Sequence, residues 1–530
     1  MADQFGDPGG MSRRGFLQLG GGAALALSGG LVLAGCGKQF SSSSTPPPTL
    51  GAPKRGGTLR VGLSGGGPSD TLDVQNPVTL PDLARSFALA DPLVRYNPLS
   101  AQTELALAEE ITPNADFTKW TVRIRRGVQL HNGREFTGDD VVASFQRIYD
   151  KKAPLSGAST FLVLDAKNIR TVDRYTVELP MLSPFNNLLD TIGNPYFLMV
   201  PRGFDPAKPI ATGPFKYHDF SPGNRSTFLR NEKYWRPGAP YLDQLIITDY
   251  GDESSQINAL SSGQLDAVGQ LSAQSYAAVR SSGATVVVSK TGSWNPVYLR
   301  SDVAPFNDAR VREAFRYIAD RDQIDNIVIS GFGSIGNDVP SPYDRDYDHG
   351  LPQRHQDLDR AKALLKAAGH EKLHVQWPVS ELATGITSMA QVFVQQASQA
   401  GVSIGIRTQT PTDYFASSYL KSSMGVSFWY YLPYLATAAM ATVGAAPFNE
   451  THWKSASYDT LYRQAVETKK PAVKAELARQ LQKIDYEQGG YIIPFFSANI
   501  DAVARKVGGL ADSKTGFPLS GFDFTRFWIA

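Results

Sequence analysis

Residues 120–141 read WTVRIRRGVQLHNGREFTGDDV, and their pattern of apolar and polar residues predicts the fold class. Trp120, Val122 and Ile124 alternate with polar residues, which is the period of a half-buried strand. Thr137 followed three residues later by Asp140 is a capping box, and the apolar stripe behind it predicts an amphipathic helix. A strand and an amphipathic helix this close together in the chain predict a mixed α and β protein.

The same mixture of elements continues on both sides of this stretch. Leu59, Val61 and Leu63 predict a strand over residues 57–63. Three more helices are expected: one capped by Asn307, one that begins at Asp357 and ends at Gly369, and one that contains Met389 and ends at Gly401. Alternating apolar residues over 402–406 then predict a strand, so a helix leads directly into a sheet layer.

Composition narrows the class of protein. The chain has 530 residues, of which 42% are apolar and 19% charged, so it is neither disordered nor collagen-like. Its 52 basic and 50 acidic residues give a net charge of +2, and we therefore expect no nucleic-acid partner. Cys36 is the only cysteine, which excludes an intramolecular disulfide and a cysteine-cluster metal site.

The N-terminal residues resemble a bacterial lipoprotein signal. The segment 12–18, SRRGFLQ, precedes a charge-free run and looks like a twin-arginine export signal, and the segment 33–36, LAGC, resembles a lipobox. We expect a signal peptide over 1–35, a lipid anchor on Cys36 and attachment to the outer face of the bacterial cytoplasmic membrane. A transmembrane helix or a buried core helix is the alternative, but seven glycines between Gly15 and Gly35 make a poor permanent span.

Residues 36–53 are rich in serine and proline and cannot bury a core. We expect this segment to be a tether. From Cys36 to Arg55 it could span at most roughly 60 Å, which is enough to hold a folded body clear of a membrane.

Three strings resemble catalytic or cofactor motifs but stand in the wrong context. The segment 62–66, GLSGG, contains Ser64 like a nucleophile elbow, yet no helix pattern follows it directly. The segment 331–336, GFGSIG, matches a dinucleotide fingerprint but follows a helix instead of a strand. The segment 370–374, HEKLH, matches a zinc-protease string, but Gly369 ends the helix that would have to carry both histidines. We therefore expect no catalytic residues, no metal and no cofactor.

Several longer blocks occur in a fixed order: LAE at 107–109 before the stretch quoted above, TGPF at 212–215, RNEKYW at 230–235, GQLD at 263–266, PFNDARVR at 305–312 with Asp320-Arg321, and AKALL at 361–365. As a set, from about Gly56 to the C-terminus, they resemble the family 5 extracellular solute-binding proteins. These are the peptide- and nickel-type binding components of bacterial ABC importers.

The resemblance implies a two-lobed periplasmic-binding-protein-like fold, with an extra subdomain inserted in lobe I and ligand held between the lobes. It places lobe I at 54–95, 206–290 and 491–530, the inserted subdomain at 96–205, and lobe II at 291–490. It also implies an ABC permease as the partner in the membrane, a solute that is not altered, and a monomer.

The segment 427–434, SFWYYLPY, has five aromatic residues and no charge. By position it is similar to a segment of the family in which an aspartate holds the amino end of a peptide, and Tyr431 stands in the place of that aspartate. A buried ammonium needs a carboxylate partner, so this departure argues against an ordinary dipeptide unless Asp413 or another acid substitutes. The expected ligand-binding residues are Ser64, Gly65, Trp294, Asn295, Phe428, Trp429, Tyr430, Tyr431 and Tyr434; the alternative is that the aromatic residues are core.

The sequence thus predicts a lipid-anchored receptor that captures an oligopeptide or peptide-like solute. A non-peptide solute, such as an oligosaccharide, a modified peptide or a metal chelate, is an alternative on the same fold. A secreted serine- or zinc-dependent hydrolase is the alternative from another class, and a sensor that binds without transport is a third.

Overall fold

The computed structural model describes residues 50–530. The predicted signal peptide, the lipobox with Cys36 and nearly all of the predicted tether lie outside the described residues. Among residues 50–530, no helix has both the length and the apolar character that a membrane span requires.

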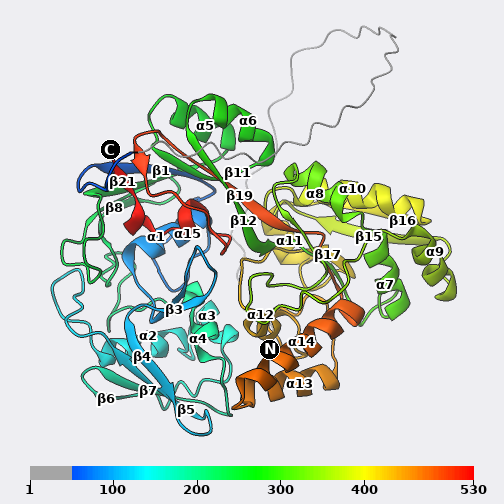
Figure 1. Cartoon of the computed structure of the whole chain (residues 1–530), viewed down its shortest axis with the longest axis horizontal. Helices are drawn as coiled ribbons and strands as arrows, with labels where there is room; N and C mark the ends of the chain where they lie inside the picture. Colours follow the sequence, from blue (N-terminus) through cyan, green and yellow to red (C-terminus); the bar gives the residue numbers. More distant parts are fainter. Residues whose placement is uncertain (1–49) are drawn as a thin grey trace, which may run out of the picture. The chain divides into compact units, whose positions relative to one another are not determined.

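The largest sheet has eight strands, in an order that brings distant parts of the sequence together (Figure 1). Its path is β12 (Thr285–Trp294), β19 (Phe495–Val503), β11 (Ala267–Leu271), β1 (Thr58–Ser64), β10 (Gln244–Tyr250), β9 (Arg225–Arg230) and β8 (Phe215–Ser221), with β14 (Ser334–Ile335) paired to β19. β1 runs parallel to both β10 and β11, whereas β19 is antiparallel to both β11 and β12. The sheet is therefore mixed, and the helices that pack against it include α1 (Leu80–Leu89), α5 (Glu253–Ser261), α6 (Tyr276–Ser281) and α15 (Pro518–Gly521).

A four-stranded antiparallel sheet contains the strand predicted from Trp120, Val122 and Ile124. Its order is β4 (Ala108–Pro113), β5 (Lys119–Ile124), β7 (Thr176–Pro180) and β6 (Arg170–Asp173). Beside it lie α2 (Gly138–Ile148), α3 (Ser156–Thr160), α4 (Leu188–Ile192) and the pair β2 (Val94–Tyr96) and β3 (Thr103–Leu105). The predicted capping box is confirmed: the backbone N–H of Thr137 donates to the carboxylate of Asp140 at 3.0 Å.

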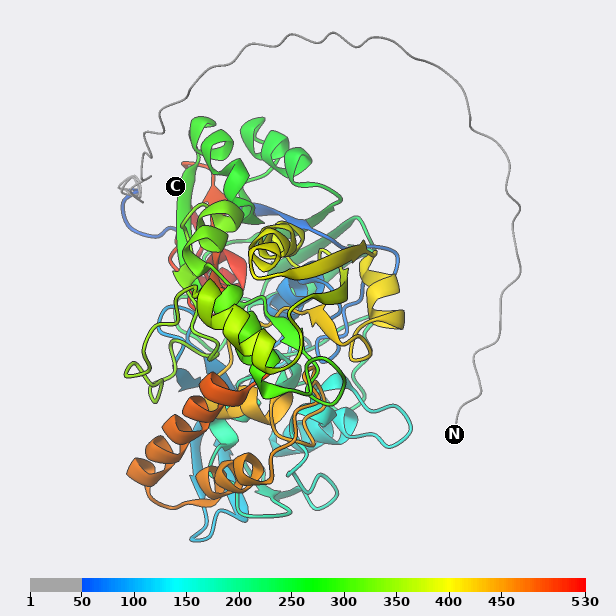
Figure 2. The same ribbon diagram turned by 90° about the vertical axis from the view of Figure 1, so that its right-hand side faces the viewer.

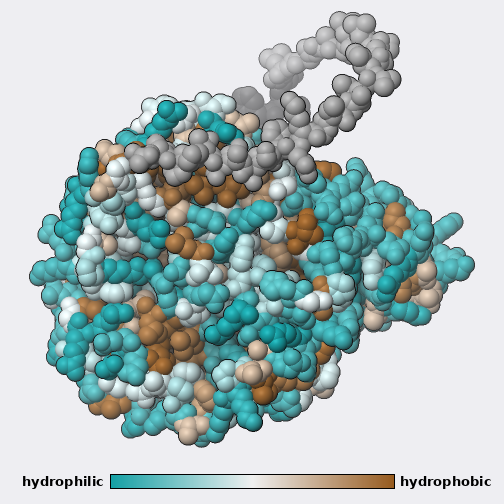
Figure 3. All heavy atoms as spheres, viewed as in Figure 1, coloured by the Kyte–Doolittle hydropathy of each residue, from teal (hydrophilic) through white to brown (hydrophobic). Residues whose placement is uncertain are grey.

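The rest of the chain is mostly helical around two small sheets. β13 (Val297–Leu299) lies between β17 (Met424–Val426) and β18 (Tyr491–Ile492), and β15 (Leu373–Val379) is parallel to β16 (Val402–Thr408). The helices are α7 (Ala309–Ile318), α8 (Arg321–Ile329), α9 (Leu358–Ala367), α10 (Ile386–Gln399), α11 (Pro411–Ser417), α12 (Tyr434–Ala441), α13 (Ala456–Glu467) and α14 (Pro471–Gln488). On the face seen in Figure 3, hydrophilic side chains prevail over the region of α9 and β16.

Most of the predicted helix ends are confirmed. Asp357 caps α9, Gly369 follows that helix with φ +79°, and Gly401 follows α10 with φ +81°. The cap of α7 is Asp308 and not Asn307, because the Asp308 carboxylate accepts a hydrogen bond from the backbone N–H of Arg310 at 2.8 Å. The mixed α/β fold class is confirmed.

Three hydrophobic clusters account for most of the core. One lies under the eight-stranded sheet and another among α7 to α10 and β15. The third joins the four-stranded sheet to α12, α13 and α14, although these helices are more than 250 residues further along the chain. Figure 2 shows the same neighbours: α13 and α14 lie beside the elements of the four-stranded sheet.

The chain passes between the eight-stranded sheet and the small sheet of β13 twice. The first passage runs from Trp294, the last residue of β12, to Val297, and the second from Ile492 in β18 to Phe495 in β19. Because β12 pairs with β19 and β13 pairs with β18, the two passages lie side by side. Paired connections of this kind allow two bodies to rotate against each other about a narrow region.

Candidate functional site

A cavity of about 430 Å³ lies where β1 and β11 end. Ser64 and Gly65 at the end of β1, with Gln270 to Ala273 at the end of β11, form one wall. Val328 and Ile329 of α8, with the loop 381–384 after β15, form the opposite wall. The carboxyl ends of parallel strands are where open α/β sheets commonly bind ligands.

The floor of this cavity comes from the two strands that lead into the chain passages. Ser293 and Asn295 lie at the end of β12, and residues 497–500 belong to β19. A solute in this cavity would therefore contact both walls and the region about which they could rotate.

A second cavity, also of about 430 Å³, adjoins the first. Both are lined by Val78, Leu80, Phe428, Trp429 and Tyr430, so we treat them as one cleft. The second cavity is the more apolar, because its further lining includes Leu83, Phe415, Met440, Phe448 and Phe517. The aromatic segment singled out in the sequence thus forms a shared wall.

The expected ligand-binding residues do not all line this cleft. Ser64, Gly65, Asn295, Phe428, Trp429 and Tyr430 line the first cavity, and Tyr431 lines the second. Trp294 and Tyr434 are not among the residues that line either cavity.

Trp294 lies behind the aromatic wall. Its ring stacks on that of Trp429, with centroids 5.6 Å apart and planes 10° from parallel, and it meets the ring of Tyr491 edge-on. The backbones of Trp294 and Trp429 also exchange two hydrogen bonds, of 3.0 and 2.9 Å. Trp294 therefore supports the position of Trp429 at the start of the first chain passage.

Tyr434 lies in the core at the start of α12. Its hydroxyl donates to the carboxylate of Asp485 at 2.6 Å, and Tyr458 donates to the same carboxylate at 3.2 Å. Burial raises the pKa of Asp485 to about 7. For Tyr434, the alternative of a core aromatic residue fits its position better than a place at the cleft.

Tyr431 lies between the second cavity and a polar cavity of about 260 Å³. Asp190, Asp344 and Lys474 are among the residues that line the polar cavity. The Tyr431 ring also lies against Gly292, where an added Cβ would come within 2.5 Å of the ring, so only glycine fits at that position.

The structure offers a candidate for the acid that could replace the carboxylate missing at Tyr431, but this candidate is not Asp413. Asp413 is exposed in the first turn of α11, where it accepts a hydrogen bond from the Thr410 hydroxyl at 2.8 Å. Glu450 lines the second cavity and is fully buried behind the aromatic wall. No local pattern marked Glu450, because it lies 21 residues after Trp429 and its importance depends on the contacts that the fold creates.

Four side-chain donors surround the Glu450 carboxylate. The hydroxyls of Tyr419 and Tyr491 donate at 2.9 and 2.7 Å, the hydroxyl of Ser427 also donates, and the indole N–H of Trp429 donates at 3.4 Å. Burial raises the pKa of Glu450, although these hydrogen bonds oppose the shift.

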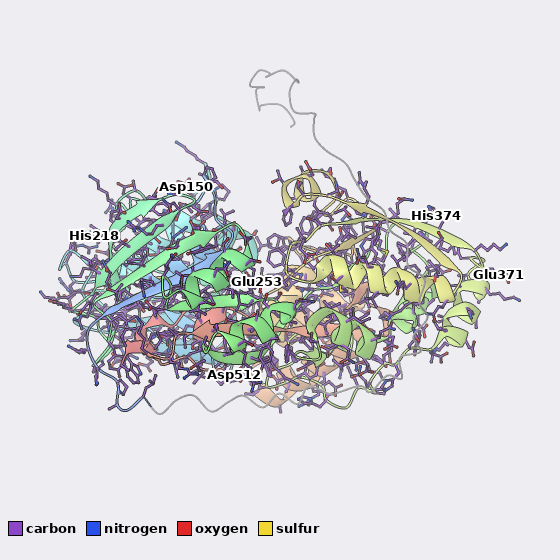
Figure 4. The ribbon with its side chains drawn as sticks, turned by 90° about the horizontal axis from the view of Figure 1, so that it is seen from above. Asp150, His218, Glu253, Glu371, His374 and Asp512 are labelled. Atoms are coloured by element: carbon purple, nitrogen blue, oxygen red, sulfur yellow. The ribbon has the colours of Figure 1, made fainter. Side chains whose placement is uncertain are left out.

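The catalytic-looking strings lie as the sequence context predicted. Ser64 is followed by Gly65 and Gly66 in the left-handed region, and the next helix, α1, begins only at Leu80, so the loop interpretation is confirmed. His370 follows the end of α9 and His374 lies in β15, so the two histidines do not share a helix. Figure 4 shows His374 and Glu371 at the outer end of their region, far from the eight-stranded sheet.

No group of three or more histidine, cysteine, aspartate or glutamate side chains within residues 50–530 is arranged to hold a metal ion. The fingerprint-like segment 331–336 leaves α8 and enters β14, which is a helix exit and not the strand-to-helix turn that a dinucleotide site requires.

Residues 102–445 match the family model of the bacterial extracellular solute-binding proteins, family 5. The chain belongs to this family. The match covers more than half of the chain and includes α8, the loop 381–384 and the aromatic segment 427–434 of the cleft.

Several relatives are similar to this chain in sequence, and a solved structure is similar to it in fold. The chain is 24% identical to heme-binding protein A of Haemophilus influenzae, over 82% of this chain and 86% of the relative. It is 25% identical to di/tripeptide-binding protein 2 of Pseudomonas aeruginosa, over 84% and 90%. The fold is similar to that of the ABC transporter-associated periplasmic binding protein DppA of Helicobacter pylori, solved in complex with the peptide STSA. The TM-score is 0.78 at 19% sequence identity, and the similarity covers 90% of this chain and 98% of that one.

Proposed function

We propose that this family 5 protein is the substrate-binding component of an ABC importer and captures an oligopeptide or peptide-like solute in the cleft described above. The observation that carries the proposal is the cleft itself, which combines walls from two separate sheets with an aromatic surface. Each cavity has the volume of a typical small-molecule site.

The proposed binding mechanism is closure of two lobes without chemical change. We assign lobe I to 54–95, 206–290 and 491–530, an inserted subdomain to 96–205, and lobe II to 291–490. A solute that contacts both lobes only in the closed form shifts the equilibrium by its difference in affinity for the two forms. Ser64 and Gly65 would contact it from lobe I, and Asn295 with residues 428–431 from lobe II.

A peptide-like solute is favoured by relatives that are named for peptides, whereas heme-binding protein A supports the alternative of a non-peptide solute. Mass spectrometry of what co-purifies with the protein from its native host would distinguish these classes. A melting screen against the same classes provides a second readout, because a ligand at 100 times its dissociation constant stabilises the folded form by about 2.7 kcal/mol. An absence of any shift, together with an empty purified protein, would contradict the proposal.

We further propose export through the twin-arginine signal, anchoring by diacylation of Cys36 and function as a monomer beside its permease. The support is the sequence of residues 12–36. Membrane fractionation of cells that express the full chain tests the anchor directly.

A further inference from the structure

The charges that line the cleft are of one sign. Among the described residues that line the two cavities, the only aspartate, glutamate, lysine, arginine or histidine residues are Glu381 and Glu450. A carboxylate group of a solute would therefore find no cationic side chain in the lining of the cleft. A positively charged group of a solute would find two carboxylates and several aromatic rings there.

The two glutamates differ in what surrounds them. Glu381 is exposed, and its carboxylate accepts hydrogen bonds from the backbone N–H groups of Gly385 and Thr387 at 2.6 and 2.7 Å, at the start of α10. These helix amides offset part of its charge. Glu450 is bonded only by neutral hydroxyl and indole donors, and no salt bridge within residues 50–530 involves it.

A buried carboxylate without a positive partner is costly, and a positive group brought close to it removes part of that cost. The rings in front of Glu450 provide a suitable surface for such a group, because the face of an aromatic ring attracts cations. Phe428, Trp429 and Tyr430 border both cavities, and Tyr419 both lines the second cavity and donates to Glu450.

We propose that the solute carries an organic cation, an ammonium or guanidinium group, which lies against the rings of residues 428–430 with Glu450 as its buried counter-charge. This inference rests on the proposed function and narrows its substrate class. Glu450 lies behind these rings, and its negative charge would attract the cation and position it against them. Anionic solutes are excluded from this part of the cleft by the same carboxylates.

The charge preference predicts a pH dependence with a definite sign. The groups that face the Glu450 carboxylate are Ser427 and Trp429 of the aromatic segment, Tyr419 after α11, and Tyr491 of β18; Tyr298 and Tyr414 lie nearby. None of them is a cation, and the tyrosines stay neutral because burial raises their pKa values. Affinity for a cation should therefore fall as acid protonates Glu450, whereas affinity for a neutral solute should not.

The test uses three matched probes based on one aromatic dipeptide: the amide with a free amino group, the N-acetylated amide, and the N-acetylated acid. They are cationic, neutral and anionic, and differ little in shape. Binding is measured by calorimetry with the full mature protein. We expect the cationic probe to bind about tenfold or more tightly than the neutral one, and the anionic probe to bind most weakly.

The Glu450→Gln variant should lose this preference, so that the cationic and neutral probes bind with similar affinity, since glutamine keeps the size of the side chain without its charge. Its amide oxygen can still accept hydrogen bonds from one pair of the donors, whereas its NH2 group accepts none. Glu381→Gln is the matched control and should keep most of the preference. If Glu450→Gln fails to fold, the pH dependence of wild-type binding carries the same test.

A neutral or anionic probe that binds at least as tightly as the cationic one would overturn the inference and leave the proposed function standing. Retention of the preference in a folded Glu450→Gln protein would also overturn it. If no probe binds and mass spectrometry finds no retained solute, the proposed function falls with the inference.

Discussion

Replacement of Trp429 by alanine tests the aromatic wall most thoroughly. Trp429 is only 9% exposed. Its ring stacks on that of Trp294 and meets the ring of Phe448 edge-on, and its indole N–H donates a hydrogen bond to Glu450. Removing a buried tryptophan of this kind should lower the free energy of unfolding by about 3–5 kcal/mol, of which the stacked pair contributes about 0.5–1.5 kcal/mol.

The same change should also weaken solute binding, because Trp429 lines both cavities. We expect a loss of about tenfold or more in affinity for the co-purified solute, measured by calorimetry at a temperature where urea titration shows the variant to be folded. Trp429→Phe keeps a ring in the wall and is the control; it should cost less in both measurements. A folded alanine variant with unchanged affinity would show that the ring belongs only to the core and would refute the argument.

Three further outcomes are expected. Burial raises the pKa of Asp485 to about 7, well above its value of about 4 in an unfolded chain. The protonated Asp485 therefore contributes to stability fully at low pH, and this contribution is lost as the pH rises through about 7. Asp485→Asn should flatten that decline in urea titrations at several pH values. Cys36→Ala should release the protein from the membrane without a change in solute affinity, and continued retention would mean that another segment anchors it. Ser64→Ala and His374→Ala should leave the bound solute chemically unchanged, as in the wild type; a product that forms only with the wild-type protein would favour the hydrolase alternative.

The local structure of the chain could be predicted from short patterns because its causes are local. The pair Thr137 and Asp140 fixes the start of α2, and Gly369 and Gly401 end their helices in the left-handed conformation that glycine adopts without strain. Even the missed cap at α7 is an error of one residue, between two neighbouring side chains that both favour the position.

The site was less predictable because it depends on pairings between distant segments. The aromatic segment suggested a binding surface, but its periodicity could not show that Tyr434 turns toward Asp485 in the core while Trp429 borders both cavities. Glu450 was missed for the same reason: a single glutamate in a polar segment carries no signal until the fold encloses it among Tyr419, Tyr491 and Trp429.

A crystal structure of the protein with the solute that it retains from its native host would locate the binding site directly. We predict an unaltered solute between the end of β1 and α8, in contact with Ser64, Asn295 and the ring of Trp429. A solute bound elsewhere on the chain, or a cleft that holds a reaction product, would contradict this prediction.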